Sequence, residues 1–123
     1  MTLELHSRAT WDLAPTDIAA YLENNDTVLV PMGSVEMHGY HLPTGTDIFN
    51  GMEVSRRAAE KANVLYTPPL WTGYSPQHLR QPNAGMGTLT FRPETIRGVI
   101  YDLTKSLIHH GFNRIIFVNG HTS

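Results

Sequence analysis

Segment 33–47, GSVEMHGYHLPTGTD, contains several side chains that can bind a metal ion. Glu36, His38 and Asp47 each offer a ligand atom, and His121 offers a fourth near the end of the chain. Carboxylate oxygen and imidazole nitrogen suit Zn²⁺, Mn²⁺ or Fe²⁺, with water completing the coordination shell. Water in such a site is a usable nucleophile near neutral pH because the cation stabilises hydroxide. These residue types therefore predict a hydrolytic metal site.

Each of these residues also has a simpler interpretation. A glutamate two positions before a histidine is common in solvated loops, and His121 could be an ordinary loop histidine. Asp47 could cap the N-terminus of a helix without any metal. Glycines at positions 33 and 120, however, would let the backbone turn closely around an ion. The combination favours the metal site over the separate alternatives.

The elements that position these residues are predicted from hydrophobic patterns. The apolar segments 27–32 and 113–120 predict strands buried on both faces, as in a parallel sheet, and 63–70 predicts a weaker strand that ends at prolines. Strands that alternate with helices indicate an α/β domain with a mostly parallel sheet. The expected helices are 16–24, with Thr16 as a potential cap, 47–62 and 93–110.

The helix at 93–110 has the strongest pattern. It starts with Pro93, has Glu94 in its first turn and stops at Gly111, a residue type favoured just after helix ends. An apolar stripe runs along it, formed by Ile96, Val99, Ile100, Leu103 and Leu107.

The predicted topology brings the candidate ligands together. Ligands of parallel α/β sheets bind at the carboxyl ends of the strands. Glu36 and His38 follow the first strand and His121 follows the last, while Asp47 lies at the start of the next helix. We therefore expect all four side chains at one edge of the sheet.

Residues 71–92 form a long segment with no hydrophobic period, which is typical of a functional loop. A short strand is expected at 88–91. Tyr74, Ser75 and His78 are candidates to line a pocket as hydrogen-bond donors. The alternative is an ordinary surface loop.

Composition narrows the class of protein. The 123 residues include no cysteine, which excludes disulfides, Cys-ligated zinc and thiol nucleophiles. The net charge of −2 and the absence of a basic run argue against a nucleic-acid partner. Neither a signal-peptide pattern nor an apolar run of membrane-spanning length is visible. We expect a cytoplasmic protein that acts on a small molecule, without membrane or nucleic-acid partners.

GSVEMHGYHLPTGTD followed by HGFNRIIFVNGH (110–121) resembles the creatininase (creatinine amidohydrolase) family. The resemblance extends from about Thr27 to the end of the chain. It implies a three-layer αβα fold and a metal-dependent hydrolase that assembles into homo- or hetero-oligomers. Family members open cyclic amides, remove formyl groups or process peptide-like substrates.

Carried over to this chain, the resemblance assigns Glu36, Asp47 and His121 to one metal ion. His38 and Asp47 would bind a second ion, with Asp47 bridging, so that one or two ions are expected. GYSPQH (73–78) resembles the substrate loop of the family, and the counterpart of His41 lies near the active site. His78 and His41 are therefore the candidates for direct catalytic roles, although His41 could instead support a ligand or cap a turn.

The chain departs from the family pattern in three ways. Creatininase itself has a metal-binding glutamate at the position of Ser123, and the loop after His78 reads LRQPNAGMGT, which differs from the usual run. The family is also about twice as long. We therefore expect residues 1–123 to be a single N-terminal, metal-binding portion of a creatininase-like domain, with the second half or a partner chain supplying further residues.

Three functions remain open from the sequence. The first is hydrolysis of a C–N bond, most plausibly in a cyclic amide. The second is hydrolytic C–C cleavage of a cyclic diketone in sugar or inositol breakdown. The third is a non-catalytic subunit or binding module that retains the fold.

Overall fold

A computed structural model describes residues 4–122 of the chain. Helices and strands alternate along most of it, as the hydrophobic patterns predict. The elements are η1 (a 3₁₀ helix, Thr10–Asp12), α1 (Pro15–Leu22), β1 (Thr27–Met32), α2 (Thr46–Ala62), β2 (Leu65–Tyr66), η2 (a 3₁₀ helix, Pro76–Leu79), α3 (Pro93–His110) and β3 (Arg114–Asn119).

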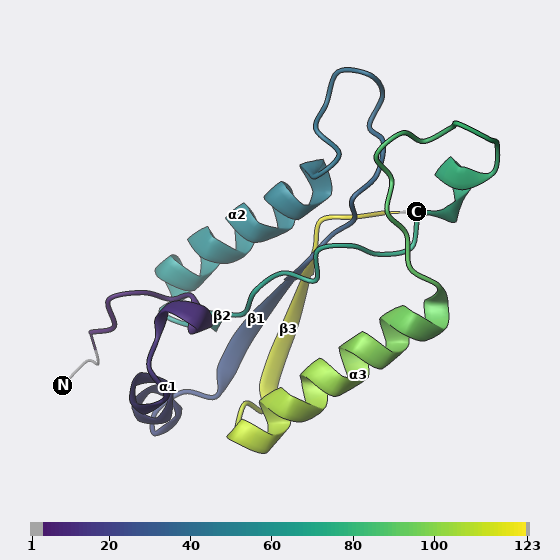
Figure 1. Cartoon of the computed structure of the whole chain (residues 1–123). Coiled ribbons are helices and arrows are strands. Elements are labelled where there is room, and N and C mark those ends of the chain that lie inside the picture. The colour runs from purple at the N-terminus through teal and green to yellow at the C-terminus, as the bar shows by residue number, and fades with distance from the viewer. Residues whose placement is uncertain (1–3, 123) are drawn as a thin grey trace.

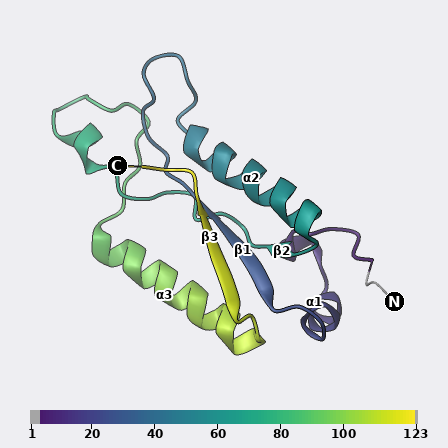
Figure 2. The same ribbon diagram turned by 180° about the vertical axis from the view of Figure 1, so that it is seen from behind.

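The three strands form one parallel sheet in the order β2-β1-β3. Val28 of β1 lies opposite Leu65, and Leu29 lies opposite Ile116. Helix α2 covers one face of the sheet, and α1 and α3 lie on the other (Figure 1; Figure 2 shows the same layers from behind). The predicted three-layer αβα arrangement with a parallel sheet is confirmed.

Alternate side chains of β1 point into two separate cores. Val28 and Val30 pack with apolar side chains from α1 and α3, including Tyr21 and Leu107. Leu29 points to the opposite face and packs in a cluster with Ala59 of α2. Because both faces are covered, the four central residues of β1 are buried, as expected for a central parallel strand.

Strand β2 is shorter than predicted for residues 63–70. Regular pairing stops at Tyr66, and Pro68 and Pro69 follow. Proline has no backbone N–H to donate to a neighbouring strand, so the ladder is interrupted there. Leu70 resumes contact with β1, where its N–H donates to the carbonyl oxygen of Pro31 over 2.9 Å.

Strand β3 differs from the prediction for residues 113–120. Its position is confirmed, but its predicted burial on both faces is wrong within the part of the chain that the structure describes. Ile116 is 50% exposed and Phe117 is 36% exposed. The reason is that β3 lies at the edge of the sheet, with β1 as its one neighbouring strand among residues 4–122.

Two helix boundaries show how local chemistry sets the ends. Helix α1 begins at Pro15 and not at a Thr16 cap, and the carboxylate of Asp17 accepts a hydrogen bond from the Ala14 N–H over 3.0 Å. Helix α3 spans the predicted residues and ends just before Gly111, whose φ of 105° is left-handed and suits glycine.

The strand expected at 88–91 is reduced to a single antiparallel bridge between Leu89 and Val35.

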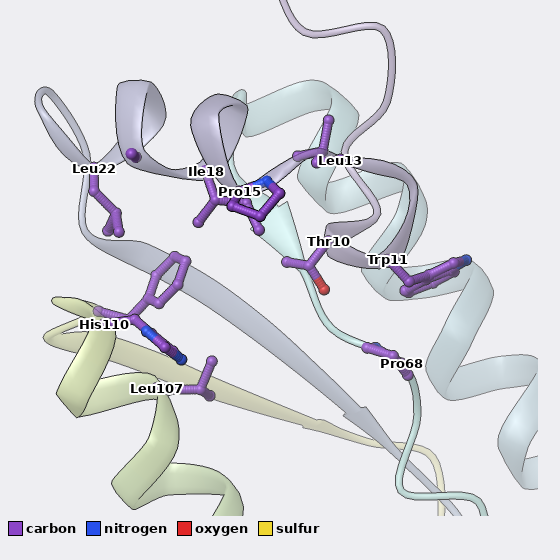
Figure 3. Close-up of a pocket in the computed structure, with 11 residues that line it drawn as sticks. Thr10, Trp11, Leu13, Pro15, Ile18, Leu22, Pro68, Leu107 and His110 are labelled. Atoms are coloured by element: carbon purple, nitrogen blue, oxygen red, sulfur yellow. The ribbon is translucent and has the colours of Figure 1, made fainter.

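An apolar cavity of about 490 Å³ lies on the face of the sheet that carries α1 and α3 (Figure 3). Leu13, Ile18, Leu107 and Phe112 are among its lining residues. No predicted site residue lines it, so it is separate from the candidate metal centre.

Within residues 4–122, no helix has both the length and the apolar character that crossing a membrane requires.

Candidate metal centre

The predicted ligands come from three segments that meet at the carboxyl ends of β1 and β3. Glu36 and His38 lie on the segment that leaves β1, Asp47 is in the first turn of α2, and His121 follows β3. The segment after β1 rises away from the sheet before it returns to α2 (Figure 1). Its position is fixed by the Glu36 N–H, which donates to the carbonyl oxygen of Thr44 over 3.0 Å.

Two glycines allow α2 to approach the strand ends. A Cβ added to Gly33 would lie 2.8 Å from the Asp47 carbonyl carbon, and one added to Gly120 would lie 2.2 Å from the Asp47 carbonyl oxygen. Both distances are far below normal contact distances. The two strand ends therefore touch the backbone of α2 directly, and this contact brings Asp47 between the two strands.

The four predicted ligands form one cluster. His121 Nδ1 lies 2.8 Å from Asp47 Oδ2 and 3.0 Å from Glu36 Oε1. His38 Nε2 lies 3.0 Å from Asp47 Oδ1 and 3.8 Å from Glu36 Oε1. Glu36, His38 and Asp47 each present one ligand atom, and these three atoms lie within 4.8 Å of one another. Asp47 thus faces one imidazole with each of its two oxygens.

The arrangement fits a divalent cation. Glu36 and Asp47 are both only 6% exposed, so two carboxylates are held close together away from water. Glu36 Oε2 is buried without a hydrogen-bond partner, although His78 Nε2 lies 3.1 Å away. A buried oxygen without a partner is costly, and a cation would satisfy it. The donor set of two carboxylates and two imidazoles matches the preferences of Zn²⁺ and Mn²⁺.

Hydrogen bonds and charges adjust the protonation of the cluster. Burial acts to raise the pKa of Glu36, but hydrogen bonding at its carboxylate and the charges of His121 and His78 bring this pKa below its usual value. The hydrogen bond from the His38 ring to the Glu36 backbone carbonyl raises the pKa of His38, against the effect of burial. The Glu36 side chain is therefore kept ionised and able to bind a cation.

The hydrogen bond of His38 also selects its ligand atom. His38 Nδ1 lies 3.1 Å from the Glu36 carbonyl oxygen, which can only accept. The proton is therefore on Nδ1, and Nε2 is directed at Asp47. Metal-binding histidines commonly use one ring nitrogen for the metal and the other for such a contact.

The interpretation of Asp47 as a helix cap is wrong. Gly45 is the N-cap of α2, Asp47 lies inside the first turn, and no side-chain capping hydrogen bond is formed. The Asp47 carboxylate instead lies 2.8 Å from His121 Nδ1.

The two predicted catalytic histidines occupy different places. His78, from η2, reaches the cluster through its contact with Glu36 Oε2 and is about 30% exposed. His41 lies exposed on the loop between β1 and α2, in the region of Gly39. The structure therefore brings His78 to the candidate metal centre and leaves His41 on the surface.

Loop 71–92 contributes contacts that the sequence did not reveal. Ser75 is fully buried, so the expectation that its side chain lines a pocket is wrong. Its hydroxyl lies 2.8 Å from that of Ser34, which is also fully buried, 41 positions earlier. Thr88 holds the ligand segment, because its hydroxyl accepts a hydrogen bond from the Met37 N–H over 2.9 Å. Ser, Thr and Gly spread over an aperiodic loop gave no signal for these pairings.

Ser123, the position at which creatininase itself has a metal-binding glutamate, lies outside the described residues.

Comparison with known proteins supports the assignment drawn from the cluster. The family model for creatinine amidohydrolase matches residues 11–123. The chain is 31% identical over 113 residues to creatinine amidohydrolase from Pseudomonas putida, which covers 91% of this chain and 42% of that protein. It is 32% identical over 101 residues to 3-dehydro-scyllo-inosose hydrolase from Thermotoga maritima, covering 81% of this chain and 31% of that protein.

A solved structure described as creatininase Mn superimposes with a TM-score of 0.84 at 29% identity. The match covers 94% of this chain and 46% of that one. The chain thus spans less than half the length of the relatives it matches. The family match over nearly all of the sequence, together with the shared fold, shows that this chain belongs to the creatininase family.

Proposed function

We propose that this chain is the N-terminal, metal-binding portion of a creatininase-type hydrolase that acts on a C–N bond of a cyclic amide. The observation that carries the proposal is the convergence of Glu36, His38, Asp47 and His121 at the ends of β1 and β3. Similarity to creatinine amidohydrolase supports the substrate class.

The chain's own residues would hold one or two divalent ions, Zn²⁺, Mn²⁺ or Fe²⁺. Glu36, Asp47 and His121 form one ligand group, while His38 extends the group on the other oxygen of Asp47. A bound divalent ion supplies Lewis acidity, which lowers the pKa of water and polarises a carbonyl. The burial of both carboxylates keeps bulk water away and strengthens their hold on a cation.

His78 is placed to move a proton in this reaction. Its Nε2 lies beside Glu36 Oε2, and its side chain is partly exposed, so it can contact both the cluster and a substrate. In amide hydrolysis the water oxygen bonds to the carbonyl carbon, the C–N bond breaks, and the leaving nitrogen takes a proton. We assign to His78 the transfer of that proton, which it takes from the attacking water and gives to the leaving nitrogen. His41, on its exposed loop, is the second candidate for contact with substrate.

A second function is supported by similarity to 3-dehydro-scyllo-inosose hydrolase. The same ligand cluster could serve hydrolytic C–C cleavage of a cyclic diketone, because that reaction also begins with attack of water on a carbonyl carbon. The choice between the two substrates rests with residues that contact the substrate ring.

The proposal includes a further part of the protein or a second chain. Ile116 and Phe117 expose apolar surface on both sides of β3, and the relatives are more than twice as long as this chain. We propose that this additional part packs against β3, adds residues to the substrate site and takes part in oligomer formation.

The decisive experiment uses the purified protein that contains this chain. It would be stripped with a chelator, reloaded with Zn²⁺, Mn²⁺ or Fe²⁺, and assayed for hydrolysis of creatinine and of 3-dehydro-scyllo-inosose. We expect metal-dependent turnover of a cyclic amide and a loss of at least about 100-fold in Asp47→Ala, since Asp47 contacts both imidazoles.

Asp102→Ala provides the control, because Asp102 is exposed on α3, away from the cluster. Turnover of the diketone alone would favour the second function. Unchanged activity in Asp47→Ala would contradict a catalytic role for the cluster. Metal binding without turnover of either substrate would favour the non-catalytic binding module.

A further inference from the structure

Two buried serines lie on the side of the His121 ring that points away from the carboxylates of Glu36 and Asp47. Ser75 Oγ is 3.4 Å from His121 Nε2 and 2.8 Å from Ser34 Oγ. Neither serine is exposed to solvent. A substrate cannot reach either hydroxyl, so any contribution to the site must pass through the residues that they contact.

The two nitrogens of His121 face different surroundings. Nδ1 faces the carboxylates of Glu36 and Asp47. Nε2 faces the Tyr74 carbonyl oxygen at 3.3 Å as well as the Ser75 hydroxyl. A carbonyl oxygen and a carboxylate can only accept hydrogen bonds, so Nε2–H donates to Tyr74 when a cation takes the place of a proton between Nδ1 and the carboxylates. The lone pair of Nδ1 then faces that cation.

Ser75 is the residue that can fix the direction of this ring. The carbonyl and the hydroxyl lie on the same side of the imidazole, and both contacts are long, so neither alone restrains the ring strongly. The position of Ser75 is itself well determined. Its N–H donates to Thr90 Oγ1 over 2.8 Å, and its hydroxyl is paired with Ser34.

The hydroxyl of Ser34, just after β1, contacts the hydroxyl of Ser75 and thereby links loop 71–92 to the end of the strand.

We infer that Ser75, held by Ser34, is a positioning residue that orients His121 so that its Nδ1 faces the metal. This inference rests on the metal-binding role proposed above. It goes beyond that role because it assigns part of the metal affinity to a pair of hydroxyls that touch neither metal nor substrate. Partners of this kind typically account for 10–100-fold in metal affinity.

The test measures Zn²⁺ affinity by competition with a chromophoric chelator, and coordination by the visible absorption spectrum of the Co²⁺-loaded protein. For Ser75→Ala we expect affinity to fall by about tenfold or more and the Co²⁺ spectrum to change. For Ser34→Ala we expect a smaller loss in the same direction. Since Ser34 acts through Ser75, the double variant should bind no more weakly than Ser75→Ala alone.

Ser55→Ala is the matched control. Ser55 is also fully buried, lies on α2, and has a hydroxyl without a hydrogen-bond partner. The same chemical change there should leave Zn²⁺ affinity and the Co²⁺ spectrum unaltered. Thermal unfolding of each variant would report any general loss of stability.

Two results would overturn the inference. One is a wild-type protein that binds Zn²⁺ while Ser75→Ala binds it equally well with the same Co²⁺ spectrum. The other is an equal loss of affinity in Ser55→Ala. A wild-type protein that binds no metal would instead contradict the proposed function, so the two failures are distinguishable.

Discussion

Strands β1 and β3 have the same kind of sequence and very different exposure. The four central residues of β1 are buried, whereas four of the six residues of β3 are exposed. Both strands are apolar and rich in β-branched residues. The comparison shows that an apolar run indicates only that a strand can be buried. The position of the strand in the sheet, central for β1 and at the edge for β3, decides how much of it is buried within residues 4–122.

The ends of β3 differ from its middle. At its start, Arg114 pairs with Asp26, and the N–H of Arg114 donates to the Asp26 carbonyl oxygen over 3.1 Å. At its end, Gly120 touches the backbone of α2. The strand is thus held firmly at both ends even where Ile116 and Phe117 are exposed. Three predictions address this contrast, from the largest expected effect to the smallest.

The most direct prediction compares two residues that lie opposite each other. Leu29 is 6% exposed and its partner Ile116 is 50% exposed. We expect Leu29→Ala to lower the free energy of unfolding by about 2–5 kcal/mol, because it opens a cavity in the core. In residues 1–123 alone we expect Ile116→Ala to cost about 1 kcal/mol or less, since half of the Ile116 surface contacts water there. Urea unfolding of the purified variants would measure both.

An equal loss at the two positions in residues 1–123 alone would break the comparison. In the full protein, a loss at Ile116 well above about 1 kcal/mol would support the proposed packing of the additional part against β3.

The second prediction concerns the close contact at the end of β3. Gly120→Ala would place a methyl group against the Asp47 carbonyl oxygen, so we expect about 1–3 kcal/mol of destabilisation and weaker Zn²⁺ binding. Gly98 on α3 is the matched control, because no atom lies within 4 Å of an added Cβ. Gly98→Ala should stabilise the protein by about 0.5–1 kcal/mol and leave metal binding unchanged.

Unfolding curves combined with Zn²⁺ titration would separate these outcomes. If Gly120→Ala bound Zn²⁺ as tightly as the wild type, the close contact between the strand end and α2 would not position Asp47.

The smallest effect is expected at the start of β3. The hydrogen bond from Arg114 lowers the pKa of Asp26 in the folded protein. A carboxyl group with a lowered folded pKa stabilises the protein above its unfolded pKa of about 3.9, and this contribution disappears as pH falls through the folded pKa. The stability difference between wild type and Asp26→Asn should therefore be constant above about pH 5 and shrink below pH 4.

Urea unfolding across this pH range would test the prediction, with Asp102→Asn as an exposed control on α3. A difference that grows toward low pH would have the wrong sign and would rule out the ionised pair.

Much of the fold was predictable because local patterns determine it. Strand β1 and helix α3 have the predicted boundaries. For α3, the hydrophobic period, Pro93 and Gly111 all indicate the same two ends. Strand β2 was overestimated because its prolines keep an extended backbone but cannot donate to a ladder. The exposure of β3 could not be predicted, because it depends on sheet order and not on the strand's own residues.

The candidate site divides in the same way. The convergence of the four candidate ligands was predictable because each follows a strand or opens a helix at one edge of a parallel sheet. The contact of His78 with Glu36 and the pairing of Ser34 with Ser75 were not, because they depend on the path of a loop without any period. The grouping of the candidate ligands was thus predictable from the sequence, and the contacts around them became visible only in the structure.

The spacing of the ligands along the chain also has a consequence for folding. Asp47 and His121 meet although they are 74 positions apart, with β2, loop 71–92 and α3 between them. The complete ligand set therefore exists only after β3 has paired with β1, which closes a long loop and is an entropically slow step. An ion bound by all four side chains would stabilise the folded protein more than partly folded molecules that lack the contact of His121. Tight metal binding would then distinguish folded from partly folded molecules, in addition to its role in hydrolysis.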